Sequence, residues 1–229
     1  MPDLVLFIIV LIMSAVVHEV SHGLAALWQG DPTAKYMGRL TLNPLKHLDP
    51  WGSFFMPVLL LLFSGGRFFF AAAKPVPYNP YNLRDQKFGP AIVGLAGPVS
   101  NIFIALVFGL FLRIFMVTGV IPGGDIMILI GNIFSGVGLL GSGLSAIGII
   151  FVTVIYINIL LAFFNLVPIP PLDGSKLLFA VLPIREETKL YLEQYGIVFI
   201  IPIIFFLSGP IFSVIRFLEL LFFKLVLGI

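Results

Sequence analysis

Two histidines and a glutamate lie within five residues near the start of the chain, in the sequence His18-Glu19-Val20-Ser21-His22. In a helix, residues four apart lie on one face, one turn apart, so both imidazoles can point at one metal ion. Two neutral imidazoles at this spacing bind zinc in metalloproteases, where the neighbouring carboxylate accepts a proton from the attacking water. The spacing therefore indicates a zinc site of the hydrolytic type.

The motif lies inside a long apolar segment, and this setting strengthens the interpretation. Ionisable groups are expensive in an apolar membrane helix and usually mark function. The alternative is a polar helix end at the water interface, but the apolar pattern continues past His22 through residues 23–28. Ser14 shares the histidine face, where it either lines a cavity or bonds to its own helix backbone. We therefore expect a metal site within the bilayer.

A zinc hydrolase needs a third protein ligand and an open position for water. The chain has no cysteine, so one of its three histidines or eleven acids must supply that ligand. His47 is one candidate, although its surroundings are typical of a loop. Asp173 is the better one, because the prolines in 168–171 end an apolar segment and Gly174 permits a sharp turn. The alternative for Asp173 is a capping residue in a plain linker.

The composition is that of a membrane protein. Of the 229 residues, 59% are hydrophobic and 10% are charged, against about 25% charged in an ordinary soluble domain. A soluble protein this apolar could not cover its own surface, so the composition excludes an ordinary soluble fold. The formal net charge of +2 is too small, and the basic residues are too scattered, for a nucleic-acid partner. The missing cysteines also exclude disulfides.

We predict an all-α polytopic membrane protein with about five to six transmembrane helices and a short re-entrant hairpin. The expected spans are 4–29, 90–117, 142–164, 195–208 and 211–228. The last two are expected to meet in a tight turn at Ser208-Gly209-Pro210. Segment 51–73 is either the re-entrant hairpin or one tilted helix, and 118–141 is an interfacial or half-inserted connection.

The whole chain, 1–229, is expected to form one membrane domain. Its catalytic core covers about 4–182, and the C-terminal helical hairpin covers about 191–229. The first apolar run has no Lys or Arg before it and contains the histidine motif, which is unlike a cleaved signal peptide. We therefore interpret it as a retained first helix.

Lysine and arginine residues predict the orientation. Residues 30–89 carry seven of the thirteen, 168–193 carry three, and 118–141 carry none. By the positive-inside rule, 30–89 and 168–193 face the cytoplasm. The histidine motif and Asp173 then both lie toward the cytoplasmic ends of helices that run in the same direction. Their depths can match, although 151 positions separate His22 from Asp173.

The two motifs together, HExxH in the first helix and NxxPxPxLDG at 165–174, resemble the site-2 protease family of intramembrane zinc metalloproteases. Further stretches are similar to the compact prokaryotic members, which have no PDZ or CBS domain: 38–50, 73–80 and 96–101. The resemblance covers about residues 14–182 and is highly specific in combination.

The resemblance implies that His18, His22 and Asp173 bind one zinc ion and that Glu19 is the catalytic acid and base. It also implies that Asn101 or Asn165 helps to hold the substrate backbone or the oxyanion, although each could instead make an interhelical hydrogen bond. The implied activity is hydrolysis of peptide bonds within or near transmembrane segments of membrane proteins. The implied location is a prokaryotic cytoplasmic membrane, with the active site toward the cytoplasm.

Two other functions fit part of the pattern. A membrane transporter or channel also uses intramembrane His, Glu and Asp, and helices broken by Gly and Pro, but it has no special use for the glutamate of the motif. A catalytically idle metal-binding scaffold is less favoured, because every residue of the catalytic set is present. The substrate, its cleavage site and the oligomeric state are left open.

Overall fold

The computed structural model describes residues 2–49, 55, 62, 74–135 and 145–229. Helices and the loops between them account for these residues, and no β-strand occurs among them, which confirms the predicted all-α class. Segment 51–73, predicted as a re-entrant hairpin or a tilted helix, lies outside the described residues apart from two isolated positions.

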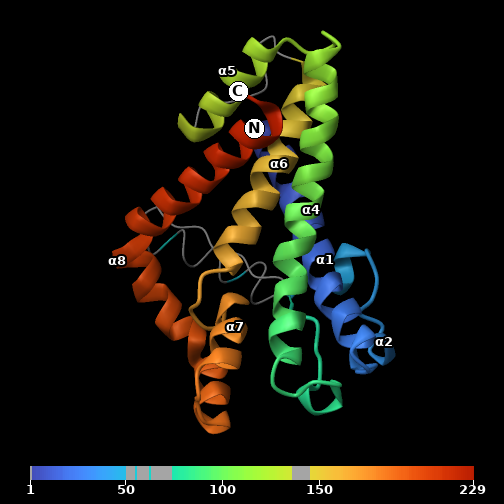
Figure 1. Cartoon of the computed structure of the whole chain (residues 1–229), viewed down its shortest axis with the longest axis vertical. Helices are drawn as coiled ribbons and strands as arrows, with labels where there is room; N and C mark the ends of the chain where they lie inside the picture. The colour runs from blue at the N-terminus through green and yellow to red at the C-terminus, as the bar shows by residue number, and fades with distance from the viewer. Residues whose placement is uncertain (1, 50–54, 56–61, 63–73, 136–144) are drawn as a thin grey trace.

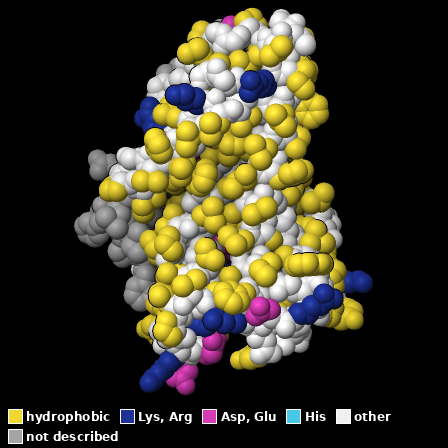
Figure 2. Space-filling view, viewed as in Figure 1, with side chains coloured by type: hydrophobic (Ala, Val, Ile, Leu, Met, Phe, Trp, Pro, Cys, Tyr) yellow, Lys and Arg dark blue, Asp and Glu magenta, His cyan; other side chains and the backbone are white. Residues whose placement is uncertain are grey.

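Three long apolar helices form the centre of the molecule (Figure 1): α1 (Pro2–Trp28), α4 (Gly89–Val117) and α6 (Ala146–Asn165). Each is long and apolar enough to cross a membrane, which confirms the spans predicted at 4–29, 90–117 and 142–164. Helices α1 and α6 run in one direction and α4 in the other, as the basic residues predicted. In Figure 2, hydrophobic side chains cover the middle of the molecule, and Lys and Arg lie toward its two ends.

Helix α4 is the element against which α1, α6, α7 (Gly174–Val181) and α8 (Glu186–Leu227) all pack. Its buried residues include a series of small ones, three or four positions apart: Gly94, Gly97, Asn101, Ala105 and Gly109. Small residues at this spacing share a face and let neighbouring helices approach closely in a membrane. At Gly109, for example, an added Cβ would lie only 2.7 Å from the Val226 side chain of α8.

Along the chain, shorter elements separate the long helices: α2 (Thr33–Tyr36), η1 (Pro44–Lys46), η3 (Pro80–Asn82) and α5 (Gly123–Ser135). Segment 118–141, predicted as an interfacial or half-inserted connection, thus contains the apolar helix α5. Ile126 and Leu129 of α5 are fully buried in a core shared with residues of α4, α6 and α8. This part of the connection packs on the bundle.

The C-terminal part of the chain is one helix of 42 residues, α8. The helical hairpin predicted at about 191–229, with spans 195–208 and 211–228, is therefore wrong. At 1.5 Å per residue α8 is about 63 Å long, and Figure 1 shows that it bends near its middle. Proline inside a helix removes a backbone hydrogen bond and bends the helix, so Ser208-Gly209-Pro210 accounts for a bend within one continuous helix where we predicted a turn. Beyond the bend, the Ser213 hydroxyl donates to the Gly209 carbonyl.

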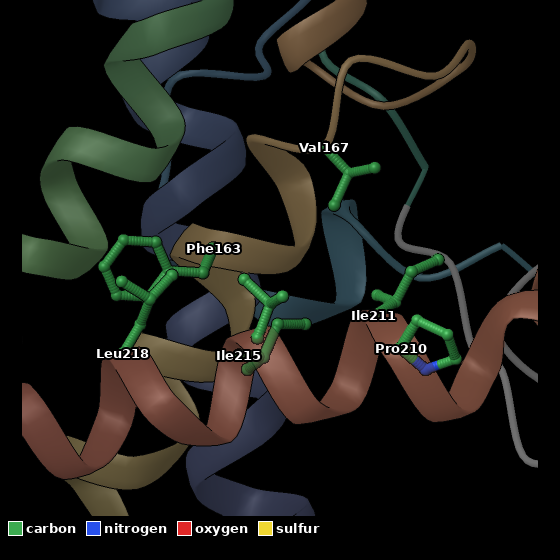
Figure 3. A pocket seen from close by; sticks show the side chains of 7 residues that line it. Phe163, Val167, Pro210, Ile211, Ile215 and Leu218 are labelled. Carbon is green, nitrogen blue, oxygen red and sulfur yellow. The ribbon is translucent and has the colours of Figure 1, made fainter.

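An apolar cavity of about 260 Å³ lies between the end of α6 and the bent part of α8. Figure 3 shows Phe163 and Val167 on the α6 side facing Pro210 and Ile215 of α8. The lining is almost wholly apolar, so this space suits an apolar group and not a charged one.

Asp31 ties the end of α1 to the segment before α4. Its carboxylate is fully buried and accepts hydrogen bonds from the Asn79 N–H at 2.7 Å and from Asn82 Nδ2 at 2.9 Å. The Thr33 hydroxyl donates a third. Burial alone would raise the pKa of Asp31, but the hydrogen bonds from Thr33, Asn82 and Asn79 hold it below its ordinary value.

Asp31→Asn is expected to destabilise the protein by about 2 kcal/mol, because an amide cannot accept all the hydrogen bonds that two carboxylate oxygens accept. The lowered pKa sets the sign of the pH dependence. The contribution of Asp31 is present above about pH 4, the pKa of an unfolded chain, and is lost as the pH falls through the lower folded-state pKa. Thermal unfolding in detergent should show the gap between wild type and variant closing at low pH.

Asp85→Asn is the matched control for Asp31→Asn. Asp85 is exposed and accepts hydrogen bonds from the N–H groups of Lys87 and Phe88 just before α4. Because asparagine accepts such bonds nearly as well as aspartate, the unfolding temperature should hardly change. Equal losses in the two variants would contradict the role given to Asp31.

Candidate metal centre

His18, His22 and Asp173 meet in one buried cluster. The histidines come from α1, and Asp173 comes from the loop that joins α6 to α7. Oδ2 of Asp173 lies 3.0 Å from His18 Nε2 and 3.1 Å from His22 Nε2. All three side chains are buried, and their potential ligand atoms lie within 4.8 Å of one another. The fold thus brings together the three residues that the sequence pattern singled out.

Carbonyl groups of α4 hold the far side of both imidazoles. His18 Nδ1 lies 2.6 Å from Asn101 Oδ1, and His22 Nδ1 lies 2.7 Å from the Val93 carbonyl oxygen. A carbonyl oxygen accepts a hydrogen bond but cannot donate one, so each Nδ1 carries the proton and donates it. A neutral imidazole in this tautomer has a bare Nε2, and both Nε2 atoms face Asp173.

The donor set fits a zinc ion. Two imidazole nitrogens and one carboxylate oxygen are a common set for catalytic zinc, which keeps a further position open for water. Here both Nε2 atoms lie about 3 Å from Oδ2 of Asp173, and a cation bound among these atoms would be attracted by the carboxylate charge. The two imidazole nitrogens and the carboxylate oxygen of this cluster therefore have the chemistry of a metal site.

Asp173 is ionised in this cluster. The Lys176 ammonium group lies 3.1 Å from Oδ1 of Asp173, and this positive charge favours the ionised carboxylate. A metal ion bound at the Nε2 atoms would favour the carboxylate in the same way. The acid is ready to act as a ligand.

A sharp turn presents Asp173 to the histidines. Prolines in 168–171 prevent α6 from continuing. At Gly174 an added Cβ would lie 2.2 Å from the Leu166 carbonyl oxygen, so only glycine fits where the loop folds back on itself. The Asp173 side chain makes no capping hydrogen bond to α7, and the capping alternative is not supported.

Glu19 lies on α1 next to His18 and is only half-buried. Its Oε2 accepts a hydrogen bond from the Val76 N–H at 2.8 Å. Val76 has proline on both sides, so its N–H is the only backbone donor in 75–77. This hydrogen bond fixes one carboxylate oxygen of Glu19. Glu19 does not belong to the cluster of potential metal ligands formed by His18, His22 and Asp173.

Asn101 is fully buried between helices. Besides accepting from His18, it donates through Nδ2 to Asn158 Oδ1 at 2.7 Å, and Asn158 Nδ2 donates to the Ser14 hydroxyl at 2.9 Å. Asn101 thus makes the interhelical hydrogen bonds that were the alternative to a substrate contact, and its geometry lends no support to a substrate contact. Our sequence reasoning missed Asn158, although a polar residue inside an apolar span was an available signal.

Two further candidates lie outside the cluster. Asn165 donates to the Leu161 carbonyl of its own helix at 2.9 Å, and a substrate contact by Asn165 stays a prediction. His47 is buried, with Nε2 2.8 Å from the Thr41 carbonyl oxygen, which agrees with the expected non-ligand role. Lys176 is a second residue that sequence reasoning missed: its Nζ lies 3.1 Å from Asp173 Oδ1.

Gly97→Ala is expected to abolish stoichiometric zinc binding. An added Cβ at Gly97 would lie 2.5 Å from His18 Nε2 and 2.6 Å from His22 Cε1, where it would displace the imidazoles from the cluster. Metal analysis of the purified, desalted protein measures the effect. Gly131→Ala on α5 is the control, because Gly131 is exposed and an added Cβ there meets no described atom within 4 Å. Unchanged zinc in Gly97→Ala would contradict the cluster geometry.

Comparisons with known proteins agree with this site. The chain matches the model of peptidase family M50 over residues 6–209. It is 36% identical over 203 residues to "Putative zinc metalloprotease YwhC" of Bacillus subtilis, covering 88% of this chain and 80% of that protein. It is 31% identical over 163 residues to "Putative zinc metalloprotease Rip2" of Mycolicibacterium smegmatis, covering 71% of this chain and 52% of that one.

No solved structure matches the chain. With its apolar spans and its histidine and aspartate cluster, the chain belongs to peptidase family M50, the site-2 protease family, and is an integral membrane zinc metalloprotease.

Proposed function

We propose that this zinc metalloprotease hydrolyses peptide bonds within or near the transmembrane segments of membrane proteins. The depth of the cluster carries the proposal. His22 and His18 lie six and ten residues before the end of α1 at Trp28, which is about 9 and 15 Å along the helix. Both are buried in a helix long and apolar enough to span a membrane. A peptide bond that reaches them has to enter the membrane-spanning part of the bundle.

The active site, in this proposal, faces the cytoplasm from a prokaryotic cytoplasmic membrane. Figure 1 has the C-terminal end of α1, the start of α4 and α7 at one end of the molecule. Segments 30–89 and 168–193, which follow α1 and α6, carry ten of the thirteen basic residues, and basic loops are retained in the cytoplasm. The two named relatives come from bacteria.

The three proposed ligands and the neighbouring Glu19 each have a role in hydrolysis. His18, His22 and Asp173 hold zinc, which when bound polarises the substrate carbonyl and makes a water molecule more acidic. Glu19 accepts a proton from the attacking water and then donates a proton to the leaving amine nitrogen. Because the Val76 N–H holds one oxygen of Glu19, the other oxygen is left for these transfers.

The substrate has to be unwound before it is cut. In a transmembrane helix each peptide N–H donates a hydrogen bond to the carbonyl oxygen four residues earlier, and side chains surround the carbonyl group that is to be attacked. Attack therefore requires that the helix opens locally at the bond. Glu19 is more exposed than the three proposed ligands, so water and the opened segment are expected to approach the cluster from the Glu19 side.

Glu19→Gln is expected to keep zinc but to slow cleavage by at least about 100-fold, because an amide cannot accept the proton. The assay uses purified protein in detergent with a tagged single-span substrate, and mass spectrometry locates the cut. Glu187→Gln, an exposed acid at the start of α8, is the control and should cleave at the wild-type rate. Wild-type cleavage by Glu19→Gln, or cuts only far from the span, would reject the proposal.

Asp173→Ala is expected to lose stoichiometric zinc, because two imidazoles alone hold the ion weakly. Metal analysis beside the wild type measures this without any substrate. Asp125→Ala, a residue in the first turn of α5, should keep the wild-type zinc content. If Asp173→Ala and wild type held equal zinc, Asp173 would be removed from the site.

A further inference from the structure

The two oxygens of Asp173 have different partners. Oδ2 faces the Nε2 atoms of His18 and His22. Oδ1 lies 3.1 Å from the Nζ of Lys176, one turn further along the chain. A carboxylate can bind a metal ion through one oxygen or both, and here a charged donor engages the oxygen that is turned away from the histidines.

Three elements hold the Lys176 side chain. It belongs to the first turn of α7, and only 18% of the side chain is exposed. Its stem packs on α4 where Gly94 leaves room, since an added Cβ there would lie 2.9 Å from Lys176 Cδ. The ammonium group lies 5.6 Å from the centre of the Tyr78 ring, a favourable cation–π position. Lys176 is therefore fixed on Oδ1 from several sides.

Lys189 forms a second ion pair at the same three-residue spacing, and it allows a comparison. Lys189 lies 2.6 Å from Glu186, also three residues apart, but the Glu186 side chain is 75% exposed. Such a surface pair contributes little and is easily replaced by water. The pair of Lys176 and Asp173 is buried, and its acid lies in the metal centre.

We propose that Lys176 is a positioning residue that occupies Oδ1 of Asp173, so that Asp173 offers zinc one oxygen only. A catalytic zinc site needs a position that no protein atom fills. If Oδ1 were free, the carboxylate could turn and bind through both oxygens, and the second would take the place of water. This inference rests on the proposed role of Asp173 as a zinc ligand.

Lys176→Met tests the inference, because methionine keeps most of the apolar stem and removes the charge and the donor. X-ray absorption at the zinc edge of the zinc-loaded protein should show about one more oxygen ligand from the carboxylate than in the wild type. Zinc should stay stoichiometric and bind no more weakly in competition with a chelator, since a nearby positive charge has been removed. Cleavage should fall about 10- to 100-fold, as for other groups that orient metal ligands.

Two further variants keep the test decisive. Lys176→Arg retains a charged donor for Oδ1 and should restore the wild-type absorption spectrum, whereas Lys189→Met should leave spectrum, zinc affinity and cleavage unchanged. An unaltered zinc spectrum in Lys176→Met would overturn the inference. So would loss of zinc together with a lowered unfolding temperature in both Lys176 variants, because that result marks a purely structural role. If the wild type held no zinc, or Asp173→Ala held as much, the proposed function itself would fail instead.

Discussion

Oδ2 of Asp173 faces the bare nitrogens of His18 and His22 inside a bundle that is otherwise largely apolar. Polar groups are stable in such surroundings only when their donors and acceptors have partners. Each remaining polar atom of the cluster has one: the carbonyls of Asn101 and Val93 accept from the histidines, and Lys176 donates to Oδ1. One small group of polar contacts thus links α1, α4 and the start of α7.

Helix α4 supplies none of the proposed ligands, yet it touches all three. Asn101 and the Val93 carbonyl set the tautomers of the histidines. Gly97 leaves space for the imidazole rings, and at Gly94 an added Cβ would lie 3.2 Å from the backbone oxygen of Asp173. Since Asn101 also bonds to Asn158 of α6, the same face of α4 joins α1, which carries the histidines, to α6, which precedes the loop of Asp173.

Apolar length, read from short stretches, was enough to predict the three spans. The meeting of the two histidines with Asp173 needed more: the four-residue spacing, the proline loop, the distribution of basic residues along the chain and the resemblance to a known family. The single helix α8 could not be predicted from Ser208-Gly209-Pro210, because glycine and proline together are compatible both with a turn and with a bend inside a helix. The partners of Asn101 and Lys176 were also beyond reach, since they depend on how α4, α6 and α7 pack.

The order of the ligands along the chain has a consequence for biosynthesis. His18 and His22 enter the membrane with the first helix, and their carbonyl partners follow with residues 93–101. The carboxylate of Asp173 is made only when about three-quarters of the 229 residues have been translated. A growing chain thus has two histidines and no third ligand while α4 and α6 are inserted. The proposed zinc site can therefore be completed only after α6 and the proline loop that follows it have been made.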